Sequence, residues 1–266
     1  MVESNVGAKS GMEILSKTDA VLHALTEHPE LSAAALAEHV DQPVSSTYRL
    51  VTNLVALGWV ESGSKRGLFR LGLDVMRIGG LLEDRVDVRE AALPTLRSLL
   101  ADTGATSFLC LRRGDQAVCV ERLEGRDVLS LALALGDSLP LYQGAAPQAL
   151  LSFLPRSERS RLLEDYEHRR AADPSIPSPS ELEKTIERTR DQGYAVSDGD
   201  VTPGIAALGA PVFNHRGELE AAISISGLRT QILDTGVPTI QLVQEAAASV
   251  SRALGYLESS VAREAS

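Results

Sequence analysis

Cysteine, aromatic residues and long apolar runs are all scarce in this chain. Its two cysteines cannot build a disulfide framework or a four-cysteine zinc site. Cys110 and Cys119 stand in strand-like apolar runs, where a cysteine acts as a small core residue. No run of about 18 apolar residues occurs, so we expect no membrane span. The polar segment Met1–Lys9 has no apolar signal core, and a cytoplasmic protein is therefore expected.

Positive charge is also in short supply. The net charge is −10, which by itself disfavours nucleic acid as a partner. Its distribution is uneven, because residues 42–72 contain four basic side chains against the single acid Glu61. A DNA-binding protein needs positive charge only where phosphates approach. The composition, 44 % hydrophobic and 23 % charged, is that of a folded chain with one large or two ordinary domains.

The first part of the chain has the pattern of three short helices followed by a hairpin. Helices are expected over residues 18–27, 32–40 and 43–57, with Ser32 as the N-cap of the second. The third helix is expected to bury three leucines, Leu50, Leu54 and Leu57. A hairpin over residues 59–71 follows, with its glycine-rich turn at 62–67.

This order of elements predicts a winged helix-turn-helix over residues 10–72, because the break at Asp41–Pro43 between the second and third helices is tight. A linker helix is expected over residues 73–87. Its apolar side chains Leu73, Met76 and Leu81 suit a homodimer or tetramer.

Strands and helices are mixed in the remaining part, residues 88–260, which predicts an α+β domain. Strands are expected at 106–111, 116–123, 128–135, 194–197, 205–213 and 218–226. Helices are expected at 88–103, 149–154, 156–170, 180–192 and 239–257. Ser180 and Glu183 have the spacing of a capping box.

The third helix and the hairpin tip carry the candidate DNA contacts. Hydroxyls near a helix N-terminus can reach phosphates or base edges, and an arginine can donate two hydrogen bonds to guanine. An ordinary solvated polar face is the alternative for the helix, and a solvated charge pair for the tip. The predicted DNA-binding residues are Gln42, Ser45, Ser46, Thr47, Arg49, Asn53, Lys65 and Arg66.

Four segments resemble the IclR family of bacterial transcriptional regulators. They are LSAAALAEHVDQPVSSTYRLVTNLVALGWVE, FRLGLDVMRIG, GDSLPLYQGAAPQALLSFLP and GYAVSDGDVTPGIAALGAPVFNHRGELEAAISISG. The resemblance covers nearly the whole chain. The resemblance implies a GAF-like effector domain with an antiparallel sheet, dimers joined through the DNA-binding part, and often tetramers.

The resemblance also implies an effector site. In members that bind small acids, two adjacent small residues give backbone amides to the ligand, here Ala145 and Ala146, and two strand serines hold a carboxylate, here Ser224 and Ser226. For the serines, plain strand polarity facing solvent is the alternative. With the neighbouring positions, the expected site is Val128, Leu131, Leu139, Ala145, Ala146, Ser197, Ile205, Ala207, Ser224 and Ser226, with Leu208 nearby.

Several positions depart from the family pattern. Ser197 replaces an aspartate, Ala207 a cysteine, Tyr142 a frequent histidine, and Pro147–Gln148 the usual Gly-Lys. The expected pocket is therefore less charged and more apolar. We expect its ligand to be a carboxylate with an apolar or aromatic skeleton, such as a catabolic intermediate.

Enzyme chemistry has little support in the sequence. Asp198 and Asp200 stand in a glycine-rich segment and are expected to be turn formers. No His-x-Glu or Cys-x-x-Cys grouping occurs, so no metal or cofactor is expected. The prediction is a regulator that binds double-stranded operator DNA under the control of a small-molecule effector. An enzyme or sensor with a GAF-like domain that does not act through DNA is the alternative, and a protein-interaction adaptor is another.

Overall fold

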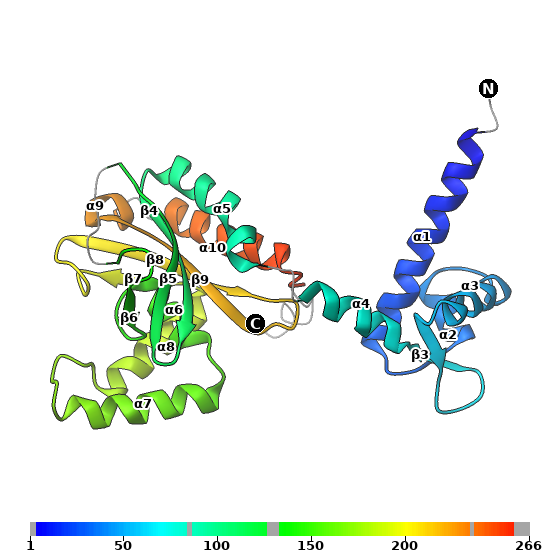
Figure 1. Ribbon diagram of the computed structural model, residues 1–266, viewed down its shortest axis with the longest axis horizontal. Coiled ribbons are helices and arrows are strands. Elements are labelled where there is room, and N and C mark those ends of the chain that lie inside the picture. The colour runs from blue at the N-terminus through cyan, green and yellow to red at the C-terminus, as the bar shows by residue number, and fades with distance from the viewer. Residues whose placement is uncertain (1–3, 84–86, 127–132, 235–236, 258–266) are drawn as a thin grey trace. The chain divides into compact units, whose positions relative to one another are not determined.

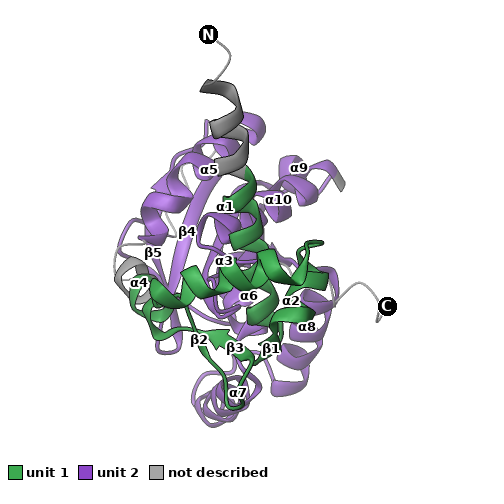
Figure 2. Ribbon diagram, turned by 90° about the vertical axis from the view of Figure 1, so that its right-hand side faces the viewer, with its two compact units in different colours: residues 1–85 green, residues 86–266 purple. Residues whose placement is uncertain are grey.

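The chain forms two compact units, Met1–Arg85 and Val86–Ser266 (Figure 2). The computed structural model describes residues 4–83, 87–126, 133–234 and 237–257. Each unit has its own hydrophobic core. None of the helices in these ranges is long and apolar enough to cross a membrane.

The N-terminal unit is a winged helix-turn-helix, as predicted (Figure 1). Its elements are α1 (Ser4–Glu27), β1 (Leu31–Ser32), α2 (Ala33–His39), α3 (Val44–Ala56), β2 (Val60–Ser62), β3 (Leu68–Leu71) and α4 (Leu73–Glu83). The three strands form an antiparallel sheet in the order β1-β3-β2. The helix α1 begins well before residue 18, and β1 was not predicted.

The connection between α2 and α3 follows the sequence prediction. Ser32 caps α2, and its Oγ accepts a hydrogen bond of 3.2 Å from the amide of Ala35. Asp41 has a positive φ of 48°, a left-handed conformation that aspartate tolerates better than most residues. This residue turns the chain from α2 into α3.

The buried face of α3 differs from the predicted one. Thr47, Val51 and Leu54 are buried, whereas Leu57 is 57 % exposed. The hydroxyl of Thr47 donates to the carbonyl of Pro43, which satisfies it inside the unit. The predicted stripe of leucines was therefore wrong at its end, and the helix is rotated toward the side of Thr47.

The C-terminal unit has helices on both faces of one antiparallel sheet, which confirms the predicted α+β class (Figure 1). The strand order is β6-β5-β4-β9-β8-β7. The strands are β4 (Thr106–Arg113), β5 (Gln116–Leu123), β6 (Ser138–Pro140), β7 (Ala195–Asp198), β8 (Ile205–Phe213) and β9 (Leu219–Leu228). The helices are α5 (Val88–Thr103), α6 (Ala145–Phe153), α7 (Arg156–Arg170), α8 (Pro179–Gln192), α9 (Arg229–Ile232) and α10 (Val237–Ala253).

The two faces of this sheet pack against different helices. Leu109, Ile223 and Ile225 pack with α5 and α10 on one face. Phe108, Cys110 and Cys119 pack with α6 and α8 on the other, and both cysteines are fully buried, as expected of small core residues. The alternation of side chains along β4 and β9 separates the two cores.

Several element boundaries of this unit were predicted wrongly. Ser178 and Glu181, not Ser180 and Glu183, form the capping box of α8, because Pro179 follows at the first helical position and needs no hydrogen-bond acceptor there. α6 begins at Ala145, before the predicted residue 149, and β6 and α9 were not predicted. Of the strand expected at 128–135, residues 128–132 lie outside the described part, and residues 133–135 contain no strand.

Candidate functional site

The outer face of α3 presents several exposed polar side chains. Ser45, Ser46, Arg49 and Asn53 are all exposed. No hydrogen bond or ion pair joins the side chain of Arg49 to another residue in the described part of the chain. Gln42 is half-buried, and its Nε2 donates to the carbonyl of Asp41 at 2.6 Å. Thr47 was also predicted to bind DNA, but it is buried and does not belong to this face.

Two further residues belong to the same face and were missed by the sequence analysis. Tyr48 is 55 % exposed and packs its ring edge-on against Phe69 of β3, with centroids 6.2 Å apart. Thr52 is exposed and donates its hydroxyl to the carbonyl of Tyr48 at 2.8 Å. The helical spacing from Ser45 to Tyr48 and Thr52 would have found both.

The hairpin between β2 and β3 is held at its base and leaves its basic residues exposed. The carboxylate of Glu30 accepts hydrogen bonds from the amide and hydroxyl of Ser64 at 2.7 and 2.6 Å, and these bonds lower the pKa of Glu30. Lys65 and Arg66 at the tip are exposed and form no ion pair with the described residues. Their charges are therefore available to a phosphate.

In the C-terminal unit, a small cavity lies between the sheet and the start of α6. The structure brings eight of the predicted site residues to its walls, namely Leu139, Ala145, Ala146, Ser197, Ile205, Ala207, Ser224 and Ser226. Phe108, Leu133 and Val201 add apolar surface, and the volume is about 50 Å³. Val128 and Leu131 lie outside the described residues. Leu208 belongs to the core on the opposite face of the sheet, because its neighbour Ala207 faces the cavity.

The strand register places the serines in adjacent rows of the sheet. Ser197 of β7 pairs with Ala207 of β8, and Ala207 pairs with Ser226 of β9. In the next row, Ser224 pairs with Gly209. Residues directly opposite each other in an antiparallel pair point to the same face, so the cavity floor consists of small and hydroxyl side chains.

Gly209 lets α6 approach this floor closely. A Cβ atom at this position would lie 2.7 Å from the backbone carbon of Ala145 and 2.8 Å from the nitrogen of Ala146, both too close for any side chain. The first amides of α6 therefore lie against the sheet beside Ser224. Such amides have no acceptor within their own helix and favour an anion.

The hydroxyls of Ser224 and Ser226 have no partner among the described residues. Ser224 is only 5 % exposed, and it lines the cavity. A buried polar group without a hydrogen bond costs stability. Both serines line the cavity, where a bound ligand would supply the missing partner.

Asp200 was predicted only to form a turn, but its carboxylate lies beside the cavity and contacts residues at its edge. Its carboxylate accepts hydrogen bonds from the hydroxyl of Ser197, from the amide of Gly144 at 2.9 Å and from Nε2 of Gln148 at 3.0 Å. Asp198, the other expected turn former, instead forms an exposed ion pair with Arg229 at 2.9 Å. Asp200 thus ties the loop after β7 to the beginning of α6.

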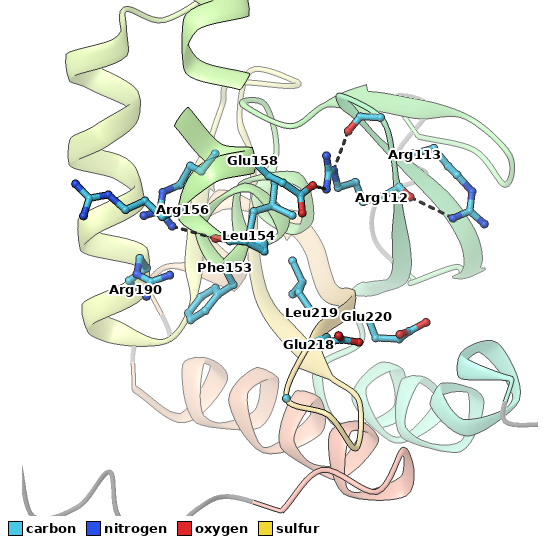
Figure 3. A pocket seen from close by; sticks show the side chains of 14 residues that line it. Arg112, Arg113, Phe153, Leu154, Arg156, Glu158, Arg190, Glu218, Leu219 and Glu220 are labelled. Atoms are coloured by element: carbon cyan, nitrogen blue, oxygen red, sulfur yellow. Dashed lines mark hydrogen bonds and ion pairs between the residues drawn. The ribbon is translucent and has the colours of Figure 1, made fainter. Parts of the chain in front are cut away.

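A second, open hollow of about 970 Å³ lies at the other end of α6 and contains none of the predicted site residues (Figure 3). Arg159 and Arg190 donate hydrogen bonds to the carbonyl of Ser152, and Arg159 also to that of Leu154. Burial, together with the charges of Arg190 and Arg156, lowers the pKa of Arg159. These arginines satisfy the last carbonyls of α6, where positive charge is favourable.

The sites of the two units together define a class of protein. One unit presents an exposed polar helix and a basic hairpin tip, as winged-helix DNA-binding domains do. The other encloses a small cavity with hydrogen-bonding groups and apolar walls, as small-molecule sites do. Within the described ranges, no group of three or more His, Cys, Asp or Glu side chains could hold a metal ion.

Comparison with known proteins agrees with this class. Residues 82–252 match the family described as "Bacterial transcriptional regulator IclR C-terminal", and residues 15–63 match the "IclR helix-turn-helix domain". The HTH-type transcriptional regulator KipR of Bacillus subtilis is 33 % identical over 241 residues, which cover 90 % of this chain and 96 % of KipR. The transcriptional repressor AllR of Escherichia coli is 29 % identical over 250 residues, 93 % of this chain and 92 % of AllR.

The fold has relatives among solved structures as well. The crystal structure of Pseudomonas aeruginosa HmgR matches with a TM-score of 0.76 at 27 % identity, and the match covers 94 % of this chain and 98 % of that chain. The chain belongs to the IclR family. It is a DNA-binding transcriptional regulator and not an enzyme.

Proposed function

We propose that an organic acid with an apolar skeleton binds in the α6 cavity and controls how the N-terminal unit binds operator DNA in the cytoplasm. The observation that carries this proposal is the cavity wall where Ser224, 5 % exposed and without a hydrogen-bond partner among the described residues, lies beside the first amides of α6. A carboxylate accepts several hydrogen bonds at once, and bonds to a charged group are the strong ones.

The cavity walls favour an aliphatic skeleton over an aromatic one. Leu139, Ile205 and Phe108 supply apolar surface for the body of the acid. The cavity holds about 50 Å³, whereas a cavity known to admit benzene measures roughly 150 Å³. A short aliphatic acid therefore needs less rearrangement of the walls than an aromatic acid does.

For the DNA contact, we propose the exposed face of α3 and the tip of the hairpin. Arg49 and Asn53 would contact bases, with Ser45, Ser46 and Gln42 close to the backbone of the operator. Lys65 and Arg66 would contact phosphates or a minor groove. Arg49 has no side-chain partner among the described residues, which supports this assignment, because its guanidinium group is then available to the DNA.

The regulator would act as a dimer or tetramer. Leu73 and Met76 of α4 are 72 % and 76 % exposed, which is unusual for large apolar side chains on one helix. Leu81 lies outside the residues whose side chains are described. Light scattering at micromolar concentration should find a dimer or tetramer, and a strict monomer that binds DNA tightly would contradict this part of the proposal.

Calorimetry on the full chain tests the effector site. Short aliphatic carboxylates should bind the wild type more tightly than benzoate does. In Ser224→Ala the affinity should fall more than tenfold, because a hydrogen bond to a charged group contributes about 1.5–3 kcal/mol. DNA affinity without ligand should stay unchanged.

Ser98→Ala is the matched control, because Ser98 is exposed on α5 and donates only to the carbonyl of Pro94. This variant should bind carboxylates like the wild type. Equal carboxylate affinity in the wild type and in a Ser224→Ala/Ser226→Ala double variant would show that the site lies elsewhere.

A further inference from the structure

The α6 cavity has two chemically different ends. At one end, the amides of Ala145 and Ala146 and the hydroxyls of Ser224 and Ser226, which have no partner among the described residues, can all donate hydrogen bonds. The other amides at the start of α6 are not available, because that of Gly144 donates to Asp200 and Pro147 has none. The donor end suits a carboxylate, as proposed above.

At the other end, the only proton of Ser197 is already in use. Its hydroxyl donates to Oδ1 of Asp200, and a carboxylate can only accept. Ser197 therefore offers nothing but lone pairs to a molecule that enters the cavity. Because its side chain is 4 % exposed and lines the cavity, the ligand itself must supply the donor.

The position of Asp200 is fixed from several sides. Its carboxylate also accepts from Gly144 and Gln148, and its backbone carbonyl accepts from Nε2 of Gln143 at 2.5 Å. Asp200 is itself exposed, but the donors on its other carboxylate oxygen orient the group, so that Oδ1 is left to accept from Ser197. The direction of the Ser197 hydroxyl is therefore built into the site.

The strand register gives the distance between the two ends. Ser197 and Ser226 lie in one row, separated only by Ala207, so their Cα atoms are two strand spacings, roughly 10 Å, apart. Two hydrogen bonds of about 2.8 Å each leave roughly 4 Å between the two ligand oxygens that reach these serines. A hydroxyl on the third carbon of an extended acid matches this span better than one on the carbon next to the carboxyl group.

We propose that the effector is a hydroxy acid whose hydroxyl stands on the third carbon or beyond and donates to Ser197. Asp200 acts as the positioning residue that makes Ser197 an acceptor. This inference rests on the proposed function, because it assumes that the carboxylate binds at the donor end of the cavity. The inference adds that Ser197 favours a ligand group that donates a hydrogen bond over one that can only accept.

Three acids of nearly equal size test the inference by calorimetry on the full chain. 3-Hydroxybutyrate has a donor at the third carbon, acetoacetate has only an acceptor there, and butyrate has neither. The wild type should bind 3-hydroxybutyrate about tenfold more tightly than the other two, because only it satisfies Ser197.

Asp200→Asn should remove the preference for a donor. The new amide can still accept from Gly144 and Gln148, but it can donate to Ser197 and turn the serine proton toward the cavity. Acetoacetate should then bind about as tightly as 3-hydroxybutyrate, because a ketone and a hydroxyl can both accept this proton, and butyrate should bind more weakly than either. If Asp200 only supported the fold, its substitution would weaken the binding of all three acids together and would leave 3-hydroxybutyrate ahead of acetoacetate.

Two more variants complete the experiment. Asp198→Asn removes the same charge from the adjacent exposed residue, which pairs with Arg229 and not with Ser197, so the wild-type order should remain. Ser197→Ala should make the three affinities equal within about twofold, because the discriminating oxygen is gone.

The outcomes separate this inference from the proposed function. If butyrate and 3-hydroxybutyrate bind the wild type equally, and Ser224→Ala weakens both, the hydroxyl assignment is overturned while the carboxylate site stands. If Ser224→Ala has no effect on either acid, the proposed site itself is wrong. A wild type that binds none of the three acids also overturns the hydroxy-acid inference.

Discussion

In the N-terminal unit, Arg49, Lys65 and Arg66, which are proposed to meet DNA, are exposed and form no ion pair with other described residues, whereas Ser197 and Ser224 in the C-terminal unit are 4 % and 5 % exposed. The first site is a surface that one helix and one hairpin present. The second is a cavity that needs β7, β8, β9 and α6 in register. The difference teaches that the proposed DNA surface should tolerate local changes, while the proposed effector cavity depends on close packing.

The largest expected effect comes from the point where this packing is closest. Gly209→Ala should destabilise the C-terminal unit by about 3 kcal/mol, because the new Cβ meets backbone atoms of α6 that cannot move aside cheaply. Carboxylate binding should be lost with it. Thermal unfolding followed by circular dichroism would measure the change.

Gly227→Ala is the control, since the atoms nearest to its Cβ would belong to side chains and not to backbone, the nearest being Cδ1 of Ile232 at 3.3 Å. This variant should unfold close to the wild-type temperature. If Gly209→Ala were as stable as Gly227→Ala, the effector site would not depend on close packing, and the comparison between the two units would fail.

A smaller effect is expected at the start of α8. Ser178→Ala should cost about 1 kcal/mol of stability, because it removes the hydroxyl that accepts from the amide of Glu181. Ser180→Ala should leave stability nearly unchanged. Chemical unfolding of the two variants distinguishes them, and the opposite ranking would contradict the observed cap.

The smallest effect is expected at the hairpin tip. Lys65→Ala and Arg66→Ala should each weaken binding to all DNA sequences by a few-fold. Each should also lower the number of counterions released on binding, read from the slope of log affinity against log salt concentration, by about one. The unit should remain folded, because Glu30 and Ser64 hold the hairpin without either residue. A loss confined to one DNA sequence would instead indicate base contacts.

The sequence predicted most of the fold because local signals were strong. Ser32, Asp41 and the glycines Gly104 and Gly193 mark helix ends, and each stands where the structure turns. The prediction failed at the capping box of α8, where both Ser178 and Ser180 have a glutamate three residues later. Ser178 is the N-cap because Pro179 occupies the first helical position. The prediction also failed at Leu57, because a polar residue, Thr47, takes the buried position on the other side of α3.

The candidate cavity was less predictable in detail. The resemblance to the family pointed to eight residues that do line one cavity. Asp200 was missed because its partners Gly144 and Gln148 are more than 50 positions away in the sequence, at 56 and 52 residues. Only the packing of α6 on the sheet brings them together, and no local pattern reports such a contact.

The most direct test of the account compares three proteins on one DNA. Fluorescence anisotropy with the DNA upstream of the gene, and no added ligand, would be measured for the wild type, Arg49→Ala and the Ser224→Ala/Ser226→Ala double variant. Arg49→Ala should lose about 1–3 kcal/mol of specific binding, while the double variant should bind like the wild type. Unchanged affinity in a folded Arg49→Ala protein, or an equal loss in the double variant, would contradict the division of roles between the two units.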